Sequence, residues 1–201
     1  TYGDWSSDVC SSDLESGGAA TVIGTRRKAH SSVAALVNGT MADALDFDDV
    51  WADDDGVVAW RGHPSVCVLP AILAAGEAHG CSGATALLAY VIGIEVAGKL
   101  GTAFGPDVGR AGFHPTSILG TLATAAAVAK VLDIDNERAK VMLGLAATEA
   151  SGLCRNFGTD TKPFHAGHAA QCGLQAALLA RAGFTANPEA ISDYLKLHEG
   201  P

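Results

Sequence analysis

Apolar residues recur along the chain at the three- and four-residue intervals of a helix face, in runs separated by short joints that contain glycine or proline. No run shows the strict alternation of apolar and polar residues that is typical of a half-buried strand. The pattern predicts helices with ends accurate to about two to four residues. They cover Ser31–Phe47, Pro64–His79, Ala84–Phe104, Pro115–Leu132, Asn136–Leu153 and Ala166–Ala182. We therefore expect an all-α fold.

Several helix ends carry the residues that favour them. Asp135 is suited to cap the helix that begins at Asn136, because its carboxylate can accept a hydrogen bond from a first-turn amide. Gly80 and Gly183 follow two predicted helices in the position where a left-handed residue commonly ends a helix. These signals support the helix boundaries independently of the apolar pattern.

Composition supports a closely packed helical domain. Of the 201 residues, 48% are hydrophobic but only 6% are aromatic, and alanine and glycine are abundant. We expect no membrane span, because the 84–104 run carries Glu95 and Lys99 at the spacing of a solvated ion pair. The net charge of −9 argues against nucleic acid as a partner but leaves room for an anionic small molecule.

The cysteines bear on the cellular compartment of the protein, and the two chain ends bear on which residues belong to it. Five cysteines (Cys10, Cys67, Cys81, Cys154 and Cys172) show neither metal-ligand spacing nor an even disulfide framework, so we expect a reduced, cytoplasmic setting. Residues 1–14 resemble the translation of a sequencing adapter and are expected to be foreign to the protein. Residues 15–201 would then be a partial domain, since the polar 186–201 segment stops without a completed element.

One phrase occurs twice: histidine, proline and a hydroxyl residue open an apolar run at His63-Pro64-Ser65 and at His114-Pro115-Thr116. Proline fits the first position of a helix, where its missing N–H is not needed. Each histidine should therefore lie at a helix N-terminus, where unpaired amides attract anions. The motif alone is more typical of two ordinary helix starts with incidental histidines, so a functional reading needs support from other residues.

The first such support is the acidic stretch Asp46-Phe47-Asp48-Asp49. Neighbouring carboxylates repel each other, so one of them could hold a proton near neutral pH and act as an acid or base. If the helix runs to Phe47 and beyond, Asp43, Asp46 and Asp49 share one face. An alternative is that Asp48, Asp49 and Asp53 form the magnesium motif of an all-α isoprenoid-type synthase.

The second support is the stretch from Thr159 to His168, in which Lys162 could bind a substrate carboxylate and His165 starts or precedes a helix. His165 and His168 lie three residues apart but lack a placed third ligand, so we expect no metal site here. The sequence shows no serine elbow, phosphate loop or dinucleotide fingerprint. Histidines, a lysine and a carboxylate suit proton abstraction next to a carboxylate, followed by elimination or isomerisation.

Together these segments resemble the MmgE/PrpD family. The matching stretches run in order: Asn38-Gly39-Thr40 through Asp46-Phe47-Asp48-Asp49, His63-Pro64-Ser65 through Leu69-Pro70-Ala71, Gly112-Phe113-His114-Pro115-Thr116, and Thr161-Lys162-Pro163 with His165-Ala166-Gly167. The resemblance covers nearly all of 33–184. It implies a 2-methylcitrate dehydratase, cis-aconitate decarboxylase, iminodisuccinate epimerase or relative.

Such enzymes act on di- and tricarboxylates without metal or organic cofactor, combine a helical domain with an α+β lid domain, and usually form homodimers. The resemblance places the catalytic positions at Asp46, His63, His114 and Lys162. We expect Lys162, His114, Thr116 and His165 to contact the substrate.

Two departures from the decarboxylase branch favour dehydration, as in propionate metabolism, or isomerisation over decarboxylation. Val50 replaces the threonine of the decarboxylase branch, and the 51–62 loop looks longer. His168 stands where many members have arginine. The lid would follow Pro201, so we expect this chain to be inactive alone. A non-catalytic helical interaction module is a third reading, which predicts that the four catalytic positions lie far apart.

Overall fold

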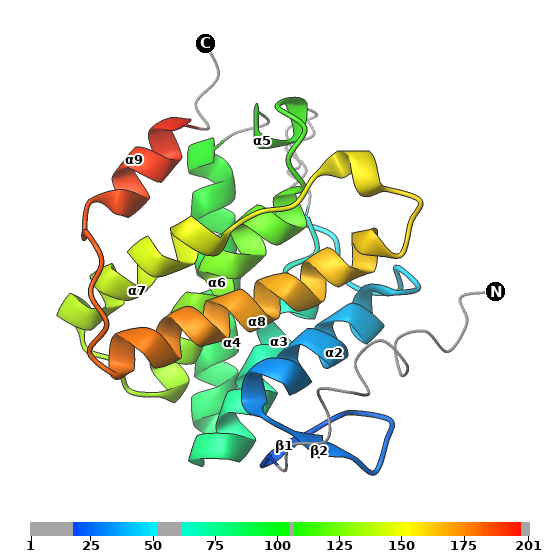
Figure 1. Cartoon of the computed structure of the whole chain (residues 1–201), viewed down its shortest axis with the longest axis vertical. Helices are drawn as coiled ribbons and strands as arrows, with labels where there is room; N and C mark the ends of the chain where they lie inside the picture. Colours follow the sequence, from blue (N-terminus) through cyan, green and yellow to red (C-terminus); the bar gives the residue numbers. More distant parts are fainter. Residues whose placement is uncertain (1–17, 52–61, 105–106, 198–201) are drawn as a thin grey trace.

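The computed structural model describes residues 18–51, 62–104 and 107–197, and it is almost entirely helical (Figure 1). The long helices are α2 (Ser31–Asp43), α3 (Pro64–His79), α4 (Gly83–Phe104), α6 (Pro115–Val131), α7 (Asn136–Glu149) and α8 (Thr161–Arg181). Shorter elements are α5 (Asp107–Arg110), the 3₁₀ helix η2 (Cys154–Asn156), α9 (Ala190–Leu197) and the antiparallel strands β1 (Ala20–Thr21) and β2 (Lys28–Ala29). The all-α prediction is confirmed. The predicted foreign segment 1–14 lies outside the described residues.

Helix α6 forms the centre of the core. Nearly every residue from Pro115 to Val131 is buried, because α3, α4, α7 and α8 all pack against it. A helix that is apolar on all sides is expected in such a position. Its buried hydroxyls are partly satisfied within the helix: Thr121 donates to the Ser117 carbonyl at 2.8 Å.

Helix α8 crosses in front of α6 and beside α2 (Figure 1), and glycines allow these close crossings. A Cβ on Gly173 would lie 2.6 Å from the Thr121 carbonyl oxygen of α6. A Cβ on Gly39 of α2 would lie 2.8 Å from the Cα of Gly167 of α8. The expectation that alanine and glycine permit tight helix packing is therefore confirmed, and the ends of α2 and α8 are held side by side.

The helix boundaries match the predictions at some ends and correct them at others. Helix α3 and the Asp135 cap, which accepts the Arg138 amide at 2.9 Å, are as predicted. Helix α2 ends at Asp43 rather than Phe47, because Asp46 takes a left-handed backbone with φ of 52°. Helix α8 begins at Thr161 rather than Ala166, since Pro163 is tolerated in a first turn.

The remaining boundary differences are smaller. Helix α7 ends at Glu149 rather than Leu153, and α4 begins at Gly83. In the described part of the chain, Cys67, Cys81, Cys154 and Cys172 are free thiols.

Among the described helices, α4 alone is long and apolar enough to cross a membrane by length and composition. The same test is passed by core helices, so it is weak evidence. One face of α4 packs on α6 and α3, where Gly93 and Ala97 are buried, and the opposite face carries the Lys99–Glu95 ion pair.

We predict that Gly167→Ala destabilises the fold by about 2 kcal/mol or more, because the added methyl group would overlap the Leu36 carbonyl and the Thr40 hydroxyl of α2. Gly83→Ala is the matched control, since a Cβ there meets nothing within 4 Å. It should be neutral or stabilise by up to about 1 kcal/mol. Urea unfolding of both variants measures the difference, and equal stabilities would contradict the packing argument.

Candidate functional site

A cavity of about 490 Å³ opens where the end of α2, the start of α3 and the η2–α8 connection meet. Its walls include Asp43, Asp46, His63, Phe157 and Lys162. Apart from Phe157, these residues come from three of the four segments singled out in the sequence. The reading as a non-catalytic module required Asp46, His63, His114 and Lys162 to lie far apart, and the structure places Asp46, His63 and Lys162 around one cavity.

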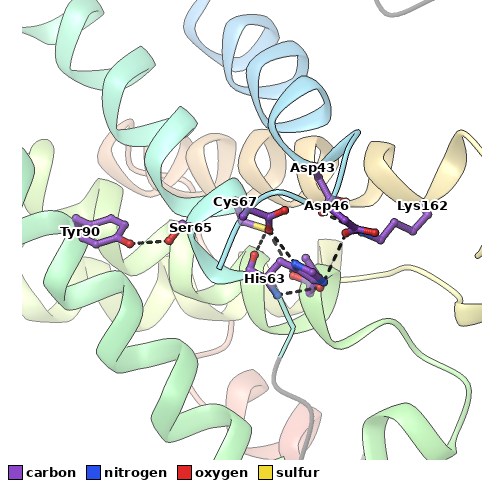
Figure 2. A network of polar contacts seen from close by, with 9 residues as sticks. Asp43, Asp46, His63, Ser65, Cys67, Tyr90 and Lys162 are labelled. Carbon is purple, nitrogen blue, oxygen red and sulfur yellow. Dashed lines mark hydrogen bonds and ion pairs between the residues drawn. The ribbon is translucent and has the colours of Figure 1, made fainter. Parts of the chain in front are cut away.

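Lys162 is the cation of this cavity, and it is already held by two carboxylates (Figure 2). Its ammonium group donates to Asp43 at 3.0 Å and forms a shorter contact with Asp46. Lys162 lies in the first turn of α8, where the helix dipole disfavours a positive charge. The two carboxylates offset that cost, and they tie α8 to the end of α2. An ammonium has three donors, so one remains beyond these two contacts.

Burial and Lys162 shift the two carboxylates in opposite directions. Burial raises the pKa of Asp43 to about 6, although the hydrogen bond and charge of Lys162 oppose the shift. The hydrogen bond from Lys162 lowers the pKa of Asp46, whose side chain is 60% exposed. The sequence predicted that repulsion within Asp46-Phe47-Asp48-Asp49 would raise the pKa of one carboxylate. In the structure the raised pKa belongs to Asp43, outside that stretch, and burial is its main cause.

The expected helical face of Asp43, Asp46 and Asp49 is wrong for the same reason that α2 was predicted too long. The chain leaves the helix at Asp43, and the left-handed turn at Asp46 points its carboxylate back toward Lys162. Aspartate tolerates this backbone conformation better than most residues. The turn also brings Asp48, rather than Asp49, to the site.

His63 is oriented by Asp48. Its Nδ1 lies 2.8 Å from the Asp48 carboxylate, and its Nε2 lies 3.9 Å from Asp46. A carboxylate oxygen accepts, so the proton of this contact is on Nδ1, and Nε2 is the nitrogen that can take another proton. The sequence offered Asp48 as a possible acid or base of the acidic stretch and as a magnesium ligand, but not as the partner of His63. The signal that could have pointed to Asp48 was its position two residues after Asp46, but no helical spacing links Asp48 to His63.

The backbone before α3 fixes where His63 stands. His63 is the N-cap of α3, and its side chain makes no capping hydrogen bond, so the ring is turned to the site instead. Its amide donates to the Thr116 hydroxyl at 3.1 Å. Gly62 has a φ of +80°, and a Cβ there would lie 2.6 Å from Thr116. Thr116, predicted to contact substrate, is buried and positions His63.

His114 lies behind the cavity wall. It caps α6 as predicted, but it has no exposed surface, and the ring of Phe157 contacts it edge-on with centroids 4.8 Å apart. Burial, then the charges of His165 and Lys162, lower the pKa of His114 to about 3. Asp46, His63 and Lys162 are all near enough to act on it electrostatically.

The two histidines of α8 point in different directions. His165 is buried and its Nδ1 lies 3.0 Å from Nδ1 of His114. His168 instead stacks on Phe164 and lies 3.4 Å from the Cys172 sulfur. They do not converge as metal ligands. His165 also lies within α8 rather than at its start, which corrects its expected position.

The grouping that could hold a metal ion, among the described residues, is Asp43, Asp46, Asp48 and His63, whose ligand atoms lie within 4.8 Å of one another. Lys162 already places a positive charge against two of these carboxylates. The predicted helical magnesium motif is wrong in form, because Asp48 and Asp49 follow the end of α2 in non-helical chain. Asp53 lies outside the described residues.

A second polar contact holds the start of α3 in place. The hydroxyls of Ser65 and Tyr90 are 2.6 Å apart and link α3 to α4 (Figure 2). Cys67 lies beneath His63, with its sulfur 3.8 Å from the His63 carbonyl. Burial raises the pKa of the Cys67 thiol, which therefore stays protonated and serves packing rather than nucleophilic attack.

Comparison with known protein families decides the relationship. The model of the MmgE/PrpD N-terminal domain matches residues 7–195. The chain belongs to the MmgE/PrpD family. The match begins inside the segment 1–14 that the sequence predicts to be foreign.

Curated members of the MmgE/PrpD family match over most of this chain. Cis-aconitate decarboxylase from Homo sapiens is 38% identical over 164 residues, which is 79% of this chain and 32% of that protein. The Mus musculus enzyme is 37% identical over the same share of each chain. A cis-aconitate decarboxylase-like protein from Aspergillus oryzae is 33% identical over 86% of this chain and 36% of its own length. The chain thus spans about a third of these relatives.

We predict that Lys162→Met destabilises the domain by about 3 kcal/mol near pH 7.5, because it leaves the carboxylate of Asp43 buried without its counter-charge. In the Lys162→Met variant, the pKa of Asp43 in the folded protein would rise further above its value in the unfolded chain. The loss of stability is therefore largest at pH values above this folded-state pKa. Near pH 5, where Asp43 takes up a proton, the destabilisation should shrink.

Urea unfolding at the two pH values measures this effect. Lys140→Met is the matched control, since the Lys140–Glu137 pair is exposed and should contribute little at either pH. An effect of Lys162→Met that does not depend on pH would contradict the assigned role of Asp43.

Proposed function

We propose that the full-length protein is a lyase for citrate-like or aconitate-like tricarboxylates, and that its own side chains perform the proton transfers. The observation that carries the proposal is the joint placement of His63, oriented by Asp48, and Lys162 on one cavity. The names of the curated relatives support the substrate class. We also propose that the reaction uses no metal or organic cofactor.

The geometry gives each group a role. Nε2 of His63 takes the proton from the carbon next to a substrate carboxylate, since Asp48 holds Nδ1. The remaining donor of Lys162 binds a substrate carboxylate and keeps it from repelling Asp46. Asp43, whose pKa is about 6, can be neutral when the anionic substrate enters.

Two reactions of this class are candidates. In dehydration, His63 removes the carbon-bound proton, the neighbouring C–O bond breaks, and the hydroxyl leaves as water after gaining a proton. Val50 on the cavity wall supports dehydration of a 2-methylcitrate-like acid, because it lacks the hydroxyl of the decarboxylase branch.

In decarboxylation, the bond to one carboxylate breaks, carbon dioxide leaves, and a protonated histidine returns a proton to the carbon. The three curated relatives named above, all called cis-aconitate decarboxylases or like them, support this reaction.

The test uses the full-length protein, incubated separately with 2-methylcitrate and cis-aconitate. Proton NMR of the products distinguishes water loss from loss of carbon dioxide. His63→Gln should lower kcat by about 10²–10⁴-fold, because it removes the proton acceptor. His79→Gln, an exposed histidine at the far end of α3, is the control and should keep the rate.

No turnover of either acid, or full activity of His63→Gln, would overturn the proposal. Magnesium-dependent binding of inorganic diphosphate, measured by calorimetry, would instead favour the isoprenoid-type alternative.

A further inference from the structure

The contact between His114 and His165 places two imidazoles nitrogen to nitrogen. Their Nδ1 atoms are 3.0 Å apart, and the ring planes are inclined at 55°. His114 opens α6, and His165 lies in the second turn of α8, so the contact joins two helices. Both side chains are buried, with exposed fractions of 0% and 5%.

Such a contact allows only one arrangement of protons between the rings. Two Nδ1 lone pairs would repel, and so would two N–H groups, so a single proton lies between them. In a neutral pair, the ring that donates carries its proton on Nδ1 and leaves Nε2 as an acceptor. The other ring must then carry its proton on Nε2. The tautomer of each histidine is therefore fixed by the tautomer of its partner.

We infer that His165 is a positioning residue that sets the tautomer of His114 and shares the charge when His114 takes up a proton. When His114 donates from Nδ1, its Nε2 accepts protons. When His165 donates instead, Nε2 of His114 carries a proton and can give it away. His114 changes from base to acid when its Nε2 gains a proton, the shared proton passes from its Nδ1 to Nδ1 of His165, and Nε2 of His165 releases its proton. The pair stays neutral overall, because one proton enters as another leaves.

The surrounding charges favour the neutral pair. Lys162 acts on both rings, His63 and Asp46 act on His114, and His168 acts on His165. Burial lowers the pKa of both histidines, and the nearby positive groups lower it further. Of these groups only Asp46 raises the pKa of His114. Both rings are therefore neutral at pH 7, which is the state in which one proton is shared.

The backbone keeps the pair in register. The His114 amide donates to the Gly152 carbonyl at 3.0 Å, and the Ser117 hydroxyl on the next turn donates to the Ser151 carbonyl and lies 3.4 Å from the His165 carbonyl. A Cβ on Gly152 would lie 3.4 Å from the His165 ring. The role of His165 is thus to orient His114. The sequence had instead suggested that His165 contacts the substrate.

The first test is nitrogen-15 NMR of the imidazoles in this chain, which does not depend on activity. At neutral pH we expect opposite tautomers, with one ring protonated on Nδ1 and the other on Nε2. In His165→Phe, His114 should lose its single tautomer. In His165→Asn, whose amide can still donate or accept, one tautomer should persist. Identical tautomers in the unaltered chain would overturn the inference.

The second test concerns the catalytic consequence and rests on the proposed function. In the full-length enzyme, His165→Phe should lower kcat by about 10- to 100-fold with little change in KM, and it should alter the pH profile of kcat. His165→Asn should recover part of the loss. His79→Phe, at an exposed histidine at the far end of α3, is the control, and it should keep both kcat and the pH profile.

The outcomes separate the two proposals. A full-length protein that turns over neither acid defeats the proposed function, while the NMR measurement still decides how the two rings share their proton. An active enzyme in which His165→Phe raises KM and leaves kcat and its pH profile unchanged would show substrate contact and overturn the positioning role.

Discussion

The site depends on the partly buried cation Lys162. Lys162 is placed at the start of α8, and its ammonium group lies between the last residue of α2 and a carboxylate from the turn that follows. Without that charge, Asp43 would be an uncompensated carboxylate in the protein interior, and the turn at Asp46 would lose its partner. The cavity, the orientation of the acidic turn and the approach of α8 to α2 follow from the same ion cluster.

The cluster requires the helices to cross closely enough for a lysine side chain to span them. Gly39 and Gly167 provide that approach, and Gly62 provides another where His63 meets the start of α6. These glycines carry no chemistry themselves. They determine how far apart the charged side chains stand, and so they are as much a part of the site as the groups that line it.

The sequence predicted the helices better than the residues at which they end. It likewise predicted the candidate site residues better than the contacts that these residues make. Proline at the first helical position was enough to place His63 and His114 as helix caps. The end of α2 was missed because the left-handed turn at Asp46 follows from the tertiary contact with Lys162. The local apolar pattern gives no sign of this turn, since the pattern continues to Phe47, a residue that is 91% exposed in the structure.

Partners remote in sequence could not be predicted at all. Neither Asp48 with His63 nor His114 with His165 forms a local sequence motif. The two residues of each pair belong to different parts of the chain, which only the tertiary fold brings together. Family resemblance identified Asp46, His63 and Lys162, which line the cavity. Thr116 and His165 were also named, but as substrate contacts and not as residues that orient the two histidines. Asp43 was visible as a helical neighbour of Asp46, yet only its burial reveals that it is the carboxylate with the raised pKa.

Phe157 gives the histidine pair a barrier against water. Its ring lies on the cavity wall and against His114, which has no accessible surface of its own. Phe157 therefore separates His114 from the contents of the cavity, so a ligand in the cavity would meet the Phe157 ring before it could reach this imidazole.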